Sequence, residues 1–297
     1  MTAAPRLHPF FVLTVAVLAV STASTFIIKA QDAGVHSLAI AAWRLTLASL
    51  ILTPLAFIRC RKEIMASWKR EWPWLILSGI CLAAHFGTWV WSLEFTSVAA
   101  SVVLVTLYPL FVGLGGWLFF GEPFGGRMIL GGVLAVAGSI IISVSDASGT
   151  GHGLRGDLLA FIGMLAVTAY FLIGKRLRRG GSLMAYIYPV YTVAAVTLLA
   201  SVLIGGIPMT GFRPMGWAWL ICLTLVCQLV GHSSLNWALA HLPAAVVTLP
   251  ILAEPVGAVL LAWVFLREAP PLWVAVGGMV VLGGLYAALR SRRSSSP

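Results

Sequence analysis

Charged side chains are scarce in this chain. Only 9% of its 297 residues are Asp, Glu, Lys or Arg, whereas water-soluble domains carry about 25%. Hydrophobic residues make up 60% of the sequence and the mean hydropathy is +0.99. This composition excludes a soluble protein. The net charge of +10 does not indicate nucleic-acid binding, because the basic residues lie in short loops between apolar runs, where they orient a membrane protein.

Cysteine and the common enzyme motifs are also lacking. The four cysteines, Cys60, Cys81, Cys222 and Cys227, show no CxxC spacing, so they indicate neither a disulfide framework nor a metal site. The chain has no GxxxxGK[ST] loop for ATP and no GxSxG turn for a nucleophilic serine. We therefore expect no enzyme, no ATP-driven pump and no bound cofactor or metal.

Long apolar runs, by contrast, fill most of the sequence. Each is close to the roughly 20 residues that a helix needs to cross about 30 Å of hydrocarbon, and a helix satisfies its own backbone hydrogen bonds in lipid. The sequence predicts an all-α integral membrane protein with ten transmembrane helices. The approximate spans are 9–29, 37–58, 73–93, 97–120, 127–145, 157–175, 183–204, 216–240, 244–266 and 271–289.

The second half of the chain repeats the first at an offset of 146 residues. The matched residues include Trp91/Trp237, Pro109/Pro255, Glu122/Glu268, Gly131/Gly277 and Lys29/Lys175. We expect two five-helix repeats, 9–145 and 157–290, joined by a polar link from Ser145 to Gly156. Because five crossings are an odd number, the second repeat must enter the membrane from the opposite side, so the repeats are inverted. The first apolar run resembles a signal peptide, but its counterpart at 157–175 has nothing to cleave, so we expect a retained helix.

Basic residues predict the orientation of the chain. With the N-terminus inside, fourteen Lys and Arg residues fall in cytoplasmic segments and four fall outside. Arg44 is counted in neither group, because it lies within a span. The Lys/Arg bias therefore predicts that both termini are cytoplasmic.

Two matching segments carry a family resemblance. They read WSLEFTSVAASVVLVTLYPLFVGLGGWLFFGEP at 91–123 and WALAHLPAAVVTLPILAEPVGAVLLAWVFLREA at 237–269. Each has a tryptophan, a mid-helix proline and a glutamate after the helix, and a glycine pair opens the next helix. The chain resembles the ten-helix EamA-type branch of the drug/metabolite transporter superfamily. This resemblance implies a carrier of small organic solutes in the bacterial inner membrane. It also suggests export of amino acids or similar metabolites. The two turns differ, because Pro follows Glu122 and Ala-Pro-Pro follows Glu268.

Pro109 and Pro255 occupy equivalent places near the middle of two predicted helices. A proline removes one backbone N–H and crowds the preceding turn. In inverted-repeat carriers, interrupted helices mark a substrate site near the midplane. The symmetric pair predicts helix breaks that line such a site. Ordinary bending of membrane helices is the other interpretation.

Two charged residues lie inside predicted spans, where charge is costly and is usually functional or paired. Glu254 has two interpretations, a counter-ion for a substrate ammonium or a carrier of protons, or else an ion-pair partner of Arg44. Arg44 in turn is a candidate clamp for a substrate carboxylate. The alternatives for Arg44 are a structural pair and a side chain that reaches toward the interface.

Two polar stripes follow helical spacing. His85, Thr88 and Ser92 lie on one predicted helix face, and Gln228, His232 and Asn236 lie on another. With Trp89 and Tyr108 as aromatic walls, these stripes predict a solute cavity between the repeats. Hydrogen bonds between helices, worth about 0.6–1.7 kcal/mol per pair, are the alternative interpretation. No third ligand has suitable spacing for a metal site.

Small residues recur near the ends of the repeats. Gly131 with Ala135, and Gly284 with Ala288, have the spacing that lets membrane helices approach closely. We assign these helices to packing between the halves or to dimer contacts, away from the substrate. The sequence leaves monomer and homodimer open.

These observations predict a secondary transporter of small organic solutes that works by alternating access, with the lipid bilayer and a small-molecule substrate as its partners. Export of amino acids or related metabolites is the favoured function. An efflux carrier for drugs or other cationic compounds is one alternative. A channel-like pore is another, although the sequence shows no filter loop and no ring of like groups.

Overall fold

The structure is a computed structural model that describes residues 8–96, 101, 104–146, 153–254, 256 and 272–290. All regular secondary structure in these ranges is helical. Six helical segments are long and apolar enough to cross a membrane: Pro9–Asp32, Ser37–Arg59, Arg61–Ser92, Leu154–Arg178, Leu183–Ile204 and Pro214–Ala238. Shorter apolar helices lie at Tyr108–Phe120, Gly126–Ile141, Ala244–Ala253 and Ala275–Ala288, where the sequence predicts the other four spans. The all-helical membrane class is confirmed, while the count of ten crossings stays a prediction.

The described part of the first half contains six helices. They are α1 (Pro9–Val20), α2 (Ala23–Asp32), α3 (Ser37–Arg59), α4 (Arg61–Ser92), α6 (Tyr108–Phe120) and α7 (Gly126–Asp146). The second half supplies α8 (Leu154–Arg178), α9 (Leu183–Ile204), α10 (Pro214–Cys222), the π-helix η1 (Leu223–His232), α11 (Ser233–Ala238), α12 (Ala244–Thr248), the 3-10 helix η2 (Leu249–Ala253) and α14 (Leu272–Arg290). In each half, a predicted span is divided between several helices: 9–29 between α1 and α2, and 216–240 between α10, η1 and α11.

The predicted helix at 9–29 is broken in its middle. α1 ends at Val20, and Ser21 and Thr22 form a turn before α2. Their hydroxyls donate to the carbonyls of Val17 and Ala19, both at 2.8 Å. Such local side-chain bonds compete with the helical ladder and often bend a helix. The break leaves Val20, the last residue of α1, and Ala23, the first residue of α2, on either side of this turn.

The helix predicted at 97–120 is also interrupted. Thr106 and Leu107 form a turn, and α6 starts at Tyr108 with Pro109 in its first turn. This position suits proline, because the first N–H groups of a helix have no intrahelical partner. Pro109 therefore begins a helix and does not bend the middle of one, which differs from the predicted mid-helix position.

The second half is interrupted between α10 and η2. The ten residues of η1 form a π-helix, a rare element that often occurs at functional sites. Further on, α12 ends at Thr248 and the chain tightens into η2, which has Pro250 in its first turn. The helical turn is wider in η1 and tighter in η2 than in an α-helix. Side chains in these two elements therefore lie on other faces than a regular α-helix would give them.

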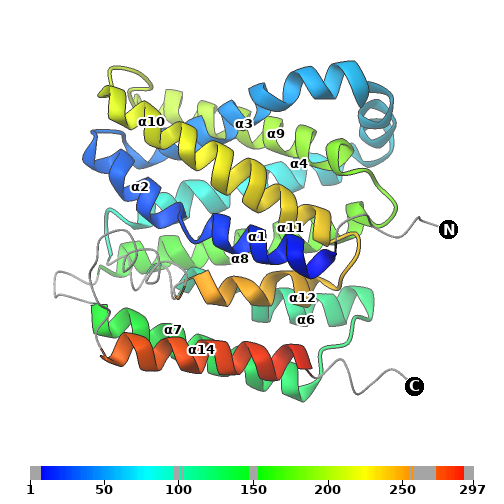
Figure 1. Ribbon diagram of the computed structural model, residues 1–297. Helices are drawn as coiled ribbons and strands as arrows, with labels where there is room; N and C mark the ends of the chain where they lie inside the picture. Colours follow the sequence, from blue (N-terminus) through cyan, green and yellow to red (C-terminus); the bar gives the residue numbers. More distant parts are fainter. Residues whose placement is uncertain are drawn as a thin grey trace.

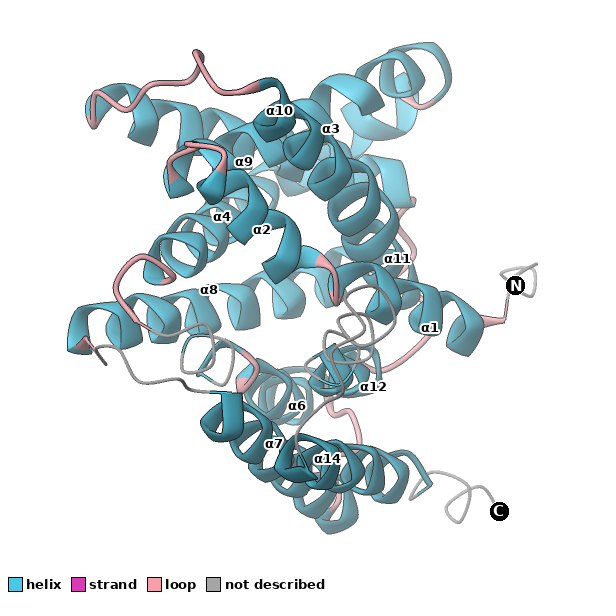
Figure 2. Ribbon diagram, turned by 60° about the vertical axis from the view of Figure 1, so that its left-hand side comes forward, coloured by secondary structure: helices cyan, strands magenta, loops and turns pink. Residues whose placement is uncertain are grey.

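The helices form two packed groups. A large buried cluster joins residues of α1–α4 with residues of α8–α11, and a second cluster joins α7 and α14 to α12 and η2. Figures 1 and 2 show α7 and α14 side by side along one edge of the bundle, with α6 and α12 between them and the rest. α1 begins and α14 ends at the same end of the bundle (Figure 1).

The pairing of α7 with α14 depends on glycine. A Cβ atom on Gly131 would lie 2.4 Å from the carbonyl oxygen of Gly284, and one on Gly138 would lie 2.6 Å from that of Gly277. Both distances are too short for any real side chain. The two helices therefore pack backbone against backbone and join the first half of the chain to the second, which is one of the two roles predicted for the small residues.

Candidate solute-binding site

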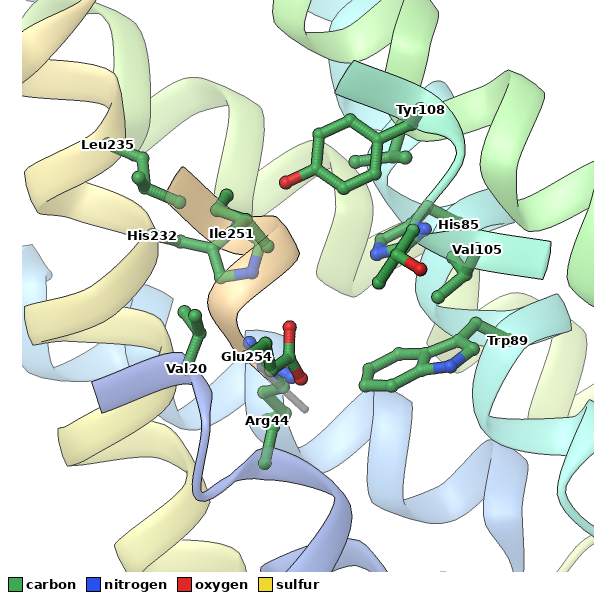
Figure 3. A pocket seen from close by; sticks show the side chains of 13 residues that line it. Val20, Arg44, His85, Trp89, Val105, Tyr108, His232, Leu235, Ile251 and Glu254 are labelled. Atoms are coloured by element: carbon green, nitrogen blue, oxygen red, sulfur yellow. The ribbon is translucent and has the colours of Figure 1, made fainter. Parts of the chain in front are cut away.

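A cavity lined mostly by buried residues lies where the interrupted helices meet (Figure 3). The first half contributes residues from α1, α2, α3, α4, α6 and the segment just before α6. The second half contributes residues from α8, η1, α11 and η2, and Glu254 just after η2. The lining residues are Val20, Ala23, Arg44, His85, Trp89, Val105, Thr106, Tyr108, Val167, His232, Leu235, Ile251 and Glu254. The cavity volume is about 40 Å³, which holds a few water molecules. A larger solute needs these walls to move apart.

Arg44 lies on α3, and its guanidinium is held in place from two directions. The side chain is 1% exposed, its Nε donates to Oε1 of Gln228 at 2.8 Å, and its Cζ lies 3.9 Å from the centre of the Phe86 ring. Nη1 and Nη2 have no hydrogen-bond partner among the described residues. A buried guanidinium requires acceptors, and the described residues supply none for these two groups.

Glu254 follows η2 and faces the same cavity as Arg44 (Figure 3). Within the described part of the chain, no ion pair of 4.0 Å or less joins the two. The direct ion pair that the sequence allows is therefore not formed in this structure. One buried space instead holds a positive and a negative group that do not touch each other.

Aromatic side chains of the first half form one wall of the cavity. The His85 ring stacks on Trp89 with 5.7 Å between ring centres, and its Nδ1 is 3.0 Å from the carbonyl oxygen of Gly163. Tyr108 stacks on Phe171 at 5.5 Å and directs its hydroxyl toward the cavity (Figure 3). The structure thus brings the predicted residues His85, Trp89 and Tyr108 together.

The predicted stripe on the second half is divided between two roles. His232 lines the cavity, whereas Gln228 and Asn236 are fully buried behind it. Gln228 holds Arg44, and the Asn236 amide donates to the Tyr170 hydroxyl at 2.6 Å and to the His232 carbonyl at 2.7 Å. Gln228 and His232 lie in the π-helix η1, whereas Asn236 lies in the α-helix α11 that follows it.

The other predicted residues do not line the cavity or lie outside the described part. Thr88 and Ser92 donate to the carbonyls of Ala84 and Trp89 on their own helix. Pro109 positions Tyr108 without lining the cavity itself. Pro255 lies outside the described residues.

Two cavity residues of the first apolar run were not among the predicted site residues. Val20 and Ala23 line the cavity on either side of the Ser21–Thr22 turn. A cluster of four hydroxyl residues, Ser21, Thr22, Ser24 and Thr25, in a largely apolar span is the signal for this turn. Val105 and Thr106 were missed for a similar reason, since they precede the start of α6 and no proline or glycine marks their turn.

Comparison with known proteins agrees with this architecture. A solved crystal structure superimposes with a TM-score of 0.80 at 19% sequence identity, covering 97% of this chain and 99% of that one. At this identity the match shows the fold alone.

Several relatives carry names that refer to transport. An uncharacterized transporter of Archaeoglobus fulgidus is 26% identical over 83% of this chain and 86% of its own length. A probable terminal-alkyne amino-acid exporter of Streptantibioticus cattleyicolor is 26% identical over 86% of both chains. The uncharacterized transporter YdfC of Bacillus subtilis is 22% identical over 64% of this chain, a match that spans 61% of YdfC, less than two thirds of its length.

The family match covers nearly the whole sequence. The model of the EamA-like transporter family matches twice, at residues 9–144 and 154–290. These two ranges nearly coincide with the two halves that the internal repeat defines. The resemblance found in the sequence is therefore confirmed. This chain is a multi-pass membrane protein, a transporter and not an enzyme, and it belongs to the EamA-like transporter family.

Proposed function

We propose that this protein is a secondary carrier that exports α-amino acids or closely related metabolites by alternating access. In this proposal it has ten transmembrane helices in two inverted five-helix repeats. It resides in the bacterial inner membrane with both termini in the cytoplasm. The solute binds in the cavity between the repeats, where Arg44 and Glu254 recognise its two charged groups.

The observation that carries the proposal is the separated pair of charges in the cavity. The two free Nη groups of Arg44 suit a carboxylate, which guanidinium groups bind through two parallel hydrogen bonds. Glu254 lines the same space and suits an ammonium group. A zwitterion that carries both groups satisfies both side chains at once, and neither charge is then left alone in a low-dielectric site.

The rest of the cavity fits the apolar portion of such a solute. The remaining lining residues include Val20, Val105, Leu235 and Ile251, and the Trp89 ring lies opposite His232 (Figure 3). The Trp89 Nε1 is buried without a partner among the described residues, so it can donate to a polar atom of the solute. The name of the Streptantibioticus relative, a probable amino-acid exporter, supports the same class of substrate.

Efflux of cationic compounds is the second candidate function. Glu254 with the aromatic rings of Trp89 and Tyr108 would attract a cation. Arg44 lines the same cavity, however, and its fixed positive charge opposes a second one. The cavity therefore favours a zwitterion over a simple cation.

Three observations support the membrane arrangement. The family match occurs once in each half, and the Lys and Arg residues favour one side by fourteen to four. α1 begins and α14 ends at the same end of the bundle (Figure 1), as an even number of crossings requires.

Counterflow in proteoliposomes tests the function. Vesicles containing the purified protein are loaded with one unlabelled solute and diluted into the same labelled solute, over a panel of amino acids and cationic drugs. We expect accelerated exchange for one or more amino acids and none for the drugs. Uptake of the labelled solute that is independent of the internal solute would indicate a pore, and exchange of the drugs alone would support the second candidate.

A further inference from the structure

A buried ion pair joins the two halves of the chain away from the cavity. Nζ of Lys175, near the end of α8, lies 3.0 Å from Oε1 of Glu122, in the segment after α6. The two side chains are only 9% and 10% exposed. A buried pair of this kind is tolerated only where further hydrogen bonds complete it.

Hydrogen bonds to the α11–α12 turn, residues 239–243, and to the first residue of α12 complete the pair. Lys175 donates to the carbonyl oxygens of Leu239 at 3.1 Å and Leu242 at 2.7 Å, so the ammonium has one acceptor for each of its three hydrogens. The other carboxylate oxygen of Glu122 accepts from the backbone N–H of Ala244 at 2.7 Å. One pair therefore ties α6, α8 and the α11–α12 turn together at a single end of the bundle.

We propose that Glu122 and Lys175, with the backbone of the α11–α12 turn, form a latch that closes one end of the solute path and must open for the solute to pass. This inference rests on the proposed alternating access. The cavity is too small for an amino acid in this structure, so some contact between the halves has to break. The latch is the contact whose loss would free three segments together.

Hydrogen bonds connect the latch to the cavity wall. Nε of Arg178, one turn beyond Lys175, donates to the Asn236 carbonyl at 3.0 Å. The Asn236 amide holds the His232 carbonyl at 2.7 Å, and the His232 side chain lines the cavity. Movement of the α11–α12 turn is thereby transmitted to a residue of the solute site.

The lysine at the equivalent place in the first half is not held in this way. Lys29 on α2 matches Lys175 in the repeat, but its side chain is 55% exposed and lies 3.9 Å from Asp32 of the same helix. α2 lies at the opposite end of the bundle from the α11–α12 turn (Figure 1). Glu268, the match of Glu122, lies outside the described residues. In the described part, the Lys175 end alone has the buried pair, as expected if one end is closed.

Cysteine accessibility tests the latch without relying on transport. A single cysteine replaces Leu235 in the cavity wall, in a protein whose four native cysteines are changed to serine or alanine. A second protein carries its only cysteine at His241, which is exposed on the α11–α12 turn and shows which vesicle face carries the latch. The measurement is the rate at which a membrane-impermeant maleimide, added to that face, labels position 235.

The expected result is specific to the pair. Lys175→Met should raise the labelling rate at least a few-fold from the latch face, because the closed state loses its main contact. Lys175→Arg should stay near the parent rate. Arg176→Met is the matched control, since Arg176 is the next residue and is 47% exposed; it should leave the rate unchanged. Glu122→Gln should raise the rate less than Lys175→Met, and the double variant should label no faster than Lys175→Met alone.

Two results would overturn the latch. One is an unchanged labelling rate in both Lys175→Met and Glu122→Gln. The other is an equal rise from both faces, which indicates general loosening. If Lys175→Met does not fold, Glu122→Gln carries the test. If the parent protein exchanges no amino acid but Lys175→Met is labelled faster, the proposed function is wrong and the latch is still supported. If the parent protein exchanges amino acids normally but labelling is unchanged in the variants, only the latch is wrong.

Discussion

At the scale of single residues, the defining feature is a guanidinium and a carboxylate that share one cavity without pairing. Their presence inside apolar spans was predictable, because an intramembrane charge is costly and rarely retained without a role. The separation of the two charged groups was not predictable, because it depends on Gln228 and Phe86. These side chains hold Arg44 from other helices, and no spacing in the sequence reports such contacts. The same applies to Asn236, whose polarity suggests a cavity position although it supports Tyr170 and His232 from behind.

The first prediction concerns Glu254. Glu254→Gln keeps the size of the side chain but removes the charge that would hold an ammonium, so exchange should fall about ten-fold or more, as expected for loss of a charged hydrogen bond. Counterflow in proteoliposomes measures this change, and monodispersity in detergent checks the fold. If Glu254 only neutralises Arg44, the double variant with Arg44→Gln should regain full exchange. That recovery, or unchanged exchange in Glu254→Gln alone, would remove Glu254 from solute binding.

The second prediction concerns the shape of the Arg44 group. Arg44→Lys keeps the positive charge but loses both the planar fork and the Nε bond to Gln228. We expect solute affinity to weaken about ten-fold or more, a free-energy change of roughly 1.4 kcal/mol or above, as measured by calorimetric titration. Arg155→Lys, at an exposed residue, is the matched control and should bind normally. Equal affinity in the two variants would contradict a bidentate carboxylate contact.

At the scale of elements, the interruptions of helices decide where the site forms. Proline marks some of them, and Pro109 in the first turn of α6 was visible as an interruption near the right place. The turn at Ser21–Thr22 and the π-helix η1 were not predicted. Hydroxyl side chains and wide turns are compatible with a straight helix as well as a broken one, so tertiary packing chooses between them. The apolar runs therefore predict the approximate spans, but they do not reveal two of the helix breaks that shape the cavity.

The α7–α14 contact gives a prediction at this scale. Glycine to alanine in a helix is normally neutral or stabilising, and Gly283→Ala should behave in that way because a Cβ there meets nothing within 4 Å. Gly131→Ala should instead lower the free energy of unfolding by about 1–3 kcal/mol, since its Cβ would press on the Gly284 carbonyl oxygen. Thermal unfolding in detergent compares the two variants. Equal melting temperatures would contradict the close backbone contact.

At the scale of the whole molecule, the internal repeat was the strongest signal in the sequence. The 146-residue offset predicts halves that the family model matches separately, and the composition alone predicts a membrane protein. The class of substrate was harder to predict from the sequence, because the cavity is assembled from nine separate helices and the sequence does not show how they are placed relative to one another. Inversion of the repeats follows from an odd number of crossings and stays a prediction.

Topology reporters test that arrangement. A reporter fused after Pro297 should be cytoplasmic, and one inserted at Gly151, in the link between the halves, should be on the opposite side, because the Lys/Arg bias fixes the orientation. Paired phosphatase and fluorescent-protein fusions measure both positions. Finding the two reporters on the same side would contradict five crossings per repeat.

Recognition of both charges of a zwitterion by one cavity can be tested directly with a matched set of solutes. Once the panel identifies an exchanged amino acid, for example leucine, counterflow is measured for leucine, for its decarboxylated amine 3-methylbutylamine and for its deaminated acid 4-methylpentanoate. All three share the same apolar portion, so differences report the charged groups alone. We expect accelerated exchange for leucine and little for the amine and the acid, since each of these leaves either Arg44 or Glu254 without its partner. Exchange of the amine or the acid at the rate of leucine would contradict it.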